Sequence, residues 1–66
     1  MSVAKVIEIS AESESSFEDA IRQGIKTAGK SLHGIKSAWV KSQQVVVKDN
    51  KITSFRVDLK VTFILD

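Results

Sequence analysis

The C-terminal segment from Phe55 to Leu65 alternates apolar and polar residues, and this pattern constrains the fold more than any other feature of the chain. Every odd position in it is apolar, and the even positions between them are polar apart from Ile64. A period of two over this length predicts a long β-strand, over residues 52–66, with one face to be buried. Only one helix is predicted elsewhere in the chain, so the strand carries more apolar surface than one copy can cover. We therefore expect the chain to be a subunit of an oligomer.

Length and composition support the same expectation. The 66 residues are expected to form one domain, residues 1–66, and a chain of this size buries only about 60% of its unfolded surface. Domains this small usually depend on disulfides, metal or oligomerisation. Cysteine is absent, and the one histidine and the scattered acidic residues lack the spacing of zinc ligands. Oligomerisation is the remaining source of stability.

The charge pattern argues against two classes of partner. Ten basic and eight acidic residues give a net charge of +2, and the basic residues are spread along the chain. Nucleic-acid binding proteins instead cluster their basic residues on one face. No apolar run approaches the ~20 residues of a membrane span, and the segment from Met1 to Val6 does not resemble a signal peptide. We expect a cytoplasmic protein with no nucleic-acid or membrane partner.

The local patterns predict an α+β fold with the order β-α-β-β, in which a three-stranded antiparallel sheet wraps around one helix. The last two strands form a hairpin, whose turn suits Asn50 because asparagine tolerates positive φ. The predicted segments are a strand over 4–10, a polar loop over 11–16, a helix over about 16–32, a strand over 35–48, a turn over 49–51 and the final strand.

Both ends of the predicted helix carry capping signals. Ser15 followed by Glu18 fits a capping box, in which each side chain satisfies a free amide of the first turn. Ser13 is an alternative N-cap, and the pattern does not decide between the two serines. Gly34 is predicted to be the left-handed residue that follows the helix.

The single tryptophan is predicted to lie on the sheet face opposite the helix. Ala38 and Val40 suit the helix side, and alternation then places Trp39 on the other face, with Arg56 if no bulge intervenes. An exposed tryptophan there is either an oligomer contact, which general interface composition favours, or a surface on which a flavin or purine ring stacks. The residues of the second strand predicted to share this face are Ser37, Trp39, Lys41 and Gln43.

No catalytic constellation is found in the sequence. His33 lies at the predicted end of the helix, where a surface or capping role is the simpler interpretation. The serines near the helix start have no base at a recognisable spacing, and the glycines do not form a phosphate-binding loop. We expect a protein that is not an enzyme and has neither catalytic nor metal-binding residues.

Three segments together resemble the dodecin family, and the resemblance covers nearly the whole chain. They are Lys5–Ile9, Ser16–Ile21 after a serine-rich loop, and Phe55–Phe63. The resemblance implies β-α-β-β subunits, twelve of which assemble into a hollow shell. It also implies paired flavins (riboflavin, FMN or FAD) held between tryptophans at two-fold related sites. The implied role is flavin storage or buffering without catalysis.

The resemblance suggests five cofactor-binding residues, with departures from the family pattern. The stacking tryptophan of the family falls at Ser37, and Trp39 comes two residues later. The glutamine at the flavin edge falls at Arg56. A polar residue near the ligand tail matches Gln44 or its neighbour Gln43.

Two hypotheses account for these departures. In the first, Trp39 replaces the missing tryptophan, displaced by ~6.6 Å along the strand. In the second, the shell has lost the usual flavin site and binds another ligand, ions or nothing. Arg56 then favours an anionic group such as phosphate, or pairs with Asp58 or an acidic residue of a neighbouring subunit.

Overall fold

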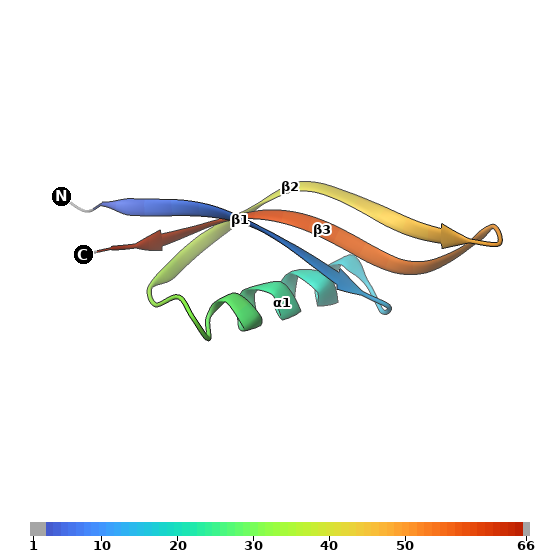
Figure 1. Cartoon of the computed structure of the whole chain (residues 1–66), viewed down its shortest axis with the longest axis horizontal. Coiled ribbons are helices and arrows are strands. Elements are labelled where there is room, and N and C mark those ends of the chain that lie inside the picture. Colours follow the sequence, from blue (N-terminus) through green and yellow to red (C-terminus); the bar gives the residue numbers. More distant parts are fainter. Residues whose placement is uncertain (1–2, 66) are drawn as a thin grey trace.

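The C-terminal strand is the centre of the sheet. The computed structural model describes residues 3–65 and contains four elements in the order β1 (Ala4–Ser13), α1 (Phe17–Ala28), β2 (Ile35–Lys48) and β3 (Lys51–Ile64). β3 lies between β1 and β2 and is antiparallel to both (Figure 1). The predicted α+β fold, with its β-α-β-β order and three-stranded antiparallel sheet, is confirmed.

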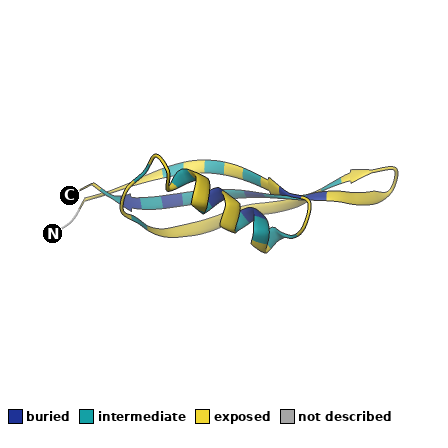
Figure 2. Cartoon of the chain, turned by 90° about the horizontal axis from the view of Figure 1, so that it is seen from below, coloured by how far each residue is buried: buried dark blue, intermediate teal, exposed yellow. Residues whose placement is uncertain are grey.

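The helix packs on one face of the sheet, over β1 and β3. The odd residues of β3 from Val57 to Phe63 are buried beneath it, which confirms the predicted burial over this stretch; Val57, Leu59 and Val61 are fully buried together with Ala20 of α1. At the two ends of the predicted alternation, Phe55 is half-buried and Leu65 is 58% exposed. Figure 2 shows the buried positions concentrated in the central strand under the helix. The partly buried residues around this core are Ile7, Ile9, Ala11, Phe17, Ile21, Ile25 and Ile35.

Gly24 allows the helix to approach the sheet closely. A Cβ atom at this position would lie 3.1 Å from the Cβ of Ala11 and 3.4 Å from a methyl group of Leu59. Both distances leave little space, so a larger residue would push α1 away from β1 and β3. The absence of a side chain at Gly24 therefore allows the short distance between the two layers.

The N-cap of α1 is Ser16, so the prediction of Ser15, or of Ser13 as its alternative, was wrong. The Ser16 hydroxyl accepts a hydrogen bond from the backbone N–H of Asp19 at 2.9 Å. Ser13 is buried and supports the turn before the helix: its Oγ accepts from the amide of Ser15 at 2.9 Å and donates to the Asp19 carboxylate at 2.6 Å. Ser13 thus stabilises the loop that leads into the cap.

The helix ends at Ala28, four residues before the predicted end at Leu32. After Ala28 the backbone N–H groups of Lys30 and Ser31 donate to the carbonyls of Thr27 and Ala28, three residues earlier, and the chain tightens into turns. Such bonds satisfy the carbonyl groups that a helix leaves free at its C-terminal end. Gly34 does have a positive φ, +75°, but it does not follow the helix directly. Its carbonyl accepts from Ile64 at 3.1 Å, so it marks the entry into β2.

β1 extends to Ser13, three residues beyond the predicted end at Ser10. Ala11, Glu12 and Ser13 are poor strand formers, but they pair with Val57, Arg56 and Phe55 of the long central strand. The backbone ladder with β3 overrides the local preference. At the other terminus, the predicted end of the last strand at Asp66 lies outside the described residues, as do residues 1–2.

The β2–β3 hairpin turns at Asp49 and Asn50, which have φ values of 53° and 62°. Positive φ at both central residues is the pattern of a two-residue type I′ turn, so the prediction of a tight turn at this place holds, with Lys51 already in β3. The turn end of the hairpin projects beyond the helix (Figure 1). The molecule is accordingly elongated, measuring 51 × 19 × 14 Å.

Candidate functional site

The sheet face opposite α1, here called the outer face, carries the polar residues of all three strands. Directly paired residues of an antiparallel sheet project to the same side, so the even positions of β3 identify their partners. The outer face thus contains Val6, Glu8, Ser10 and Glu12 of β1, Arg56, Asp58, Lys60 and Thr62 of β3, and Ser37, Trp39, Ser42 and Gln44 of β2.

Trp39 lies on this face, as predicted from the sequence. It pairs with Lys60 in the β2–β3 ladder and is 67% exposed. The Lys60 ammonium lies over the indole, 5.5 Å from the ring centroid. A cation over an exposed aromatic ring contributes about 0.5–1 kcal/mol. One aromatic surface of the outer face is thus exposed and has a cation beside it.

A β-bulge in β2 changes which glutamine belongs to the outer face. The ladder shifts between Val40 and Ser42, which makes Lys41 an extra residue. Gln43 consequently pairs with Val57 on the helix side, so its predicted place beside Trp39 was wrong. Gln44 pairs with Arg56 and takes the outer position. The prediction assumed strict alternation along β2, and the inserted Lys41 reverses the faces of Gln43 and Gln44, which follow it.

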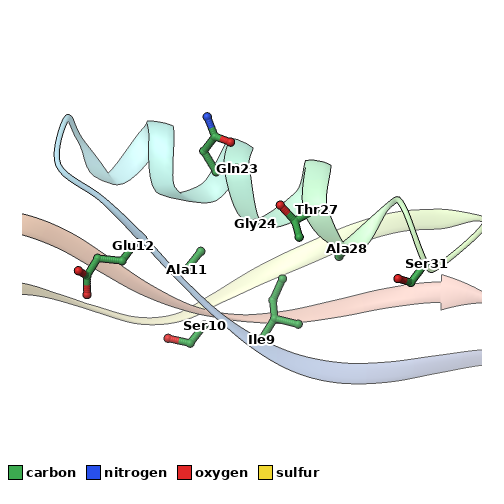
Figure 3. Close-up of a pocket in the computed structure, with 9 residues that line it drawn as sticks. All are labelled: Ile9, Ser10, Ala11, Glu12, Gln23, Gly24, Thr27, Ala28 and Ser31. Atoms are coloured by element: carbon green, nitrogen blue, oxygen red, sulfur yellow. The ribbon is translucent and has the colours of Figure 1, made fainter.

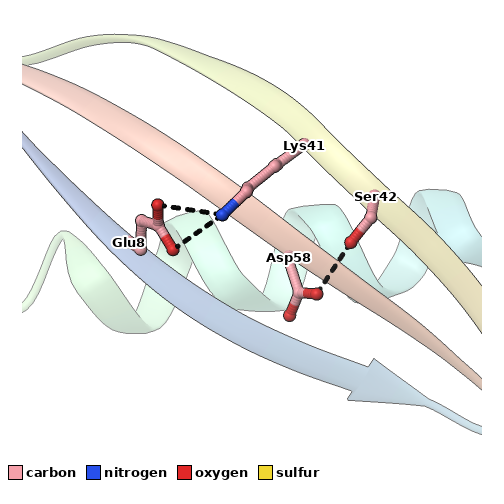
Figure 4. Close-up of polar contacts among 4 residues, drawn as sticks. All are labelled: Glu8, Lys41, Ser42 and Asp58. Carbon is pink, nitrogen blue, oxygen red and sulfur yellow. Dashed lines mark hydrogen bonds and ion pairs between the residues drawn. The ribbon is translucent and has the colours of Figure 1, made fainter.

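The bulge places two side chains of β2 across the sheet (Figure 4). Lys41 Nζ reaches over the central strand to the Glu8 carboxylate of β1, at 3.2 and 3.4 Å. Ser42 Oγ donates to Asp58 Oδ2 of β3 at 2.8 Å. These contacts connect both edge strands of the outer face.

The guanidinium of Arg56 binds a carboxylate of its own chain. Its Nε and Nη2 lie 2.9 and 2.7 Å from Oε1 of Glu12 on β1. Within one chain the ion-pair partner of Arg56 is thus Glu12 and not Asp58, one of the partners that the sequence suggested. Sequence reasoning missed it because Glu12 was placed in a loop. Hydrogen bonds from Arg56 and Ser54 hold the pKa of the Glu12 carboxyl below its ordinary value.

Asp58 is held by hydroxyl groups on both sides. Hydrogen bonds from Ser42 and Ser10 lower the pKa of the Asp58 carboxyl, and the positive charges of Lys41 and Arg56 add to this effect. The lowered pKa values of Glu12 and Asp58 thus both result from donors of the same chain.

The five residues predicted as cofactor-binding are not all brought together. Ser37 pairs with Thr62 and lies next to the Trp39–Lys60 pair. Gln44 and Arg56 form a second pair, four positions further along β3, and Gln43 is on the opposite face. Lys60, which adjoins Trp39, was not among the predicted site residues. The signal for it was available, since it belongs to the even positions of the final strand.

An open cavity of about 500 Å³ lies between β1 and α1 (Figure 3). Its titratable residue is Glu12, whose carboxylate is already bound to Arg56. The remaining lining residues are small, apolar or neutral: Ile9, Ser10, Ala11, Gln23, Gly24, Thr27, Ala28 and Ser31. Sequence reasoning did not predict this cavity, because it depends on how α1 crosses the end of β1.

Residues 3–65 do not group three His, Cys, Asp or Glu side chains so that they would hold a metal ion. Nor does α1, the helix of these residues, have the length and apolar character needed to cross a bilayer.

Comparison with known proteins identifies the family. The Dodecin family model matches residues 3–66. A dodecin from Streptomyces davaonensis is 31% identical, with a TM-score of 0.93 over 98% of this chain and 96% of that one. A variant of the Thermus thermophilus dodecin is 27% identical, with a TM-score of 0.93 over 100% and 98% of the two chains.

A third solved structure is named a calcium dodecin, a calcium-chelating antigen of Mycobacterium tuberculosis. It is 35% identical, with a TM-score of 0.85 over 98% of this chain and 93% of that one. Among curated protein sequences there is no significant match. The family model covers nearly the whole sequence, and the β-α-β-β structure agrees with it: the chain belongs to the dodecin family.

Proposed function

We propose that this chain is a non-catalytic binding protein that assembles into a homododecamer and stores or buffers flavin. The observation that carries the proposal is Trp39, a large aromatic side chain of β2 that is 67% exposed. An indole exposed in this way offers a wide π-face for an isoalloxazine ring. We further propose that residues 1–66 form one domain and that the protein acts in the cytoplasm.

Exposed apolar residues of the hairpin support an assembly. Val40 and Val45 of β2 project to the helix side of the sheet but are each 37% exposed, since α1 packs on β1 and β3. Val47 and Ile52 are 56% and 58% exposed near the turn. Apolar surface on two sides of a small domain is typical of a protein that associates. We propose that other copies of the chain cover these exposed apolar residues.

The predicted site residues fit a flavin in part: Ser37 lies beside the Trp39–Lys60 pair, and Gln44 lies four positions further along β3 on the same face. Ser37 and Gln44 present hydrogen-bonding groups on the same face, and flavin rings have several polar edge atoms for such groups to contact. Gln43 points to the other side, and Arg56 is bound to Glu12. We therefore assign stacking to Trp39 and polar contacts to Ser37 and Gln44, and assign Arg56 to holding β1 against β3.

A second candidate function is an ion-binding shell without flavin. It is favoured by the 35% identity to a protein named a calcium dodecin. Residues 3–65 of one copy do not group three potential metal ligands. Calcium takes six to eight oxygen ligands, so a calcium site in this proposal completes its set with backbone carbonyls, water or oxygen atoms of other copies.

Titration of riboflavin fluorescence with the purified protein tests the first function. We expect quenching at micromolar protein, loss of quenching in Trp39→Ala, and partial retention in Trp39→Phe, which keeps an aromatic face. Light scattering after size exclusion should give the mass of twelve chains. Absence of quenching, together with calcium binding in a calorimetric titration, would favour the ion-binding shell.

A further inference from the structure

Arg56 and Lys60 of β3 lie on the outer face, and the bulge residue Lys41 reaches it through Glu8. Two of these three cations are neutralised by carboxylates of the same chain. Lys41 is paired with Glu8 at 3.2 Å, and Arg56 with Glu12 at 2.7 Å. Lys60 has no carboxylate partner within 4 Å among residues 3–65, and its contact is the indole of Trp39. Of these three cations, Lys60 has its charge still available.

The neighbours of Lys60 leave that charge open to a ligand. Glu8 pairs with Lys60 in the β1–β3 ladder, but its carboxylate is bound to Lys41. Asp58, two residues along β3, accepts hydrogen bonds from hydroxyl groups. The two nearest acidic groups on these strands are thus engaged, and Lys60 is half-buried beside Trp39.

We infer that Trp39 and Lys60 together bind a planar aromatic ligand that carries an anionic group, and that Lys60 makes the protein prefer a phosphate-bearing flavin over riboflavin. This rests on the proposed flavin-binding function. The indole supplies the stacking surface, and the ammonium supplies the charge. The ligand phosphate takes the place of the indole as the partner of the ammonium.

The exchange of partners is energetically accessible. The cation–π contact of an exposed pair is worth only about 0.5–1 kcal/mol. Lysine has a flexible four-carbon stem and three donors, so its ammonium can leave the ring without moving the strand. A phosphate is a doubly charged acceptor near neutral pH and is a stronger partner than a π-face. Arg56 is not equivalent, because it would first have to release Glu12.

The test compares FMN with riboflavin, which have the same ring system and differ by the phosphate. Quenching titrations at low salt should give FMN a dissociation constant about fivefold lower than riboflavin, since an exposed ion pair contributes up to about 1 kcal/mol. In Lys60→Gln the two constants should become equal. Lys26→Gln, on the exposed side of α1, is the matched control and should keep the preference.

The wild-type protein gives a second measurement that does not depend on the variant folding. Salt should weaken FMN binding and leave riboflavin binding unchanged, because screening acts on the charged group. If neither flavin quenches, the proposed function itself fails and this inference with it. If both flavins bind with equal constants in the wild type, or if Lys60→Gln keeps the FMN preference, flavin binding stands and the role of Lys60 is overturned.

Discussion

β2 and β3 are equally long, 14 residues each, and are paired along the hairpin, yet they differ sharply in burial. β3 alternates buried and half-buried residues, whereas nearly all of β2 is exposed. Val40 and Leu59 form one cross-strand pair, and Leu59 is fully buried while Val40 is 37% exposed. The difference comes from α1, which packs on β1 and β3. In this small domain a strand residue is therefore buried where α1 covers it and exposed where α1 does not.

The comparison divides the molecule into two parts: β1, β3 and α1, which share a buried core, and β2, whose apolar residues remain largely exposed. β1, β3 and α1 bury a common core within one chain. β2 extends the sheet but places Val40, Val45 and Trp39 in solvent. Four variants or conditions test this division, in order of decreasing effect.

Leu59→Asp should prevent folding. The substitution places a carboxylate under α1 at a position with no exposed surface, and the expected loss exceeds about 4 kcal/mol. Lys60→Ala, the next residue on the outer face, is the matched control and should change the thermal midpoint only slightly. If circular dichroism melts of the two variants are alike, the assignment of the two faces is wrong.

Val45→Asp should leave the fold of one copy intact and reduce its assembly. Val45 is on the same side of the sheet as Leu59 but is 37% exposed, so a carboxylate there can reach water in the single copy and becomes fully buried only against a partner. Light scattering after size exclusion should show smaller species, with far-UV dichroism preserved. Val45→Thr, which keeps the β-branched shape, should assemble more fully. A fully assembled Val45→Asp protein would exclude this side of β2 from the interface.

Acid should lower the stability of the fold by protonating the carboxylates of the outer face, Glu12 and Asp58. The folded pKa of Glu12 lies below its ordinary value of 4.5, and that of Asp58 below 3.8. Such depressed values stabilise the fold above the ordinary pKa, and this contribution is lost as pH falls through the folded pKa. The thermal midpoint should therefore decrease below about pH 4.5, and less so in Glu12→Gln. The control Glu14→Gln, in the loop before α1, should behave as wild type; equal pH profiles of the two variants would contradict a role for the Glu12–Arg56 pair.

Asn50→Gly should stabilise the hairpin by about 0.5 kcal/mol, because glycine adopts positive φ without a Cβ penalty and Asn50 has a φ of 62°. Asn50→Val should destabilise by about 1 kcal/mol, since a β-branched residue disfavours this region. Urea unfolding of both variants measures the difference. A more stable valine variant would show that the turn does not keep its positive φ values.

The candidate site was predictable in some residues and not in others. The position of Trp39 opposite the helix followed from alternation, because the ladder from Ala38 to Val40 is regular. The loss of Gln43 from that face and the reach of Lys41 to Glu8 followed from a bulge, for which β2 carries no glycine or proline signal. The Arg56–Glu12 pair required β1 to continue through Ala11 and Glu12, against their local preferences.

The sequence by itself determined the element order and the buried side of β3, because a strict period of two permits only one face of that strand to be apolar. It also placed the hairpin turn, since Asp49-Asn50 tolerates the positive φ that a two-residue turn requires. The tertiary structure decided the helix end, the length of β1, the bulge and the incomplete cover of β2. The helix end coincides with local bonds between residues 27 and 31, whereas the other three features appear only when the strands pair with β3 and α1 packs on the sheet. Such long-range contacts leave no periodic pattern in the residues that make them.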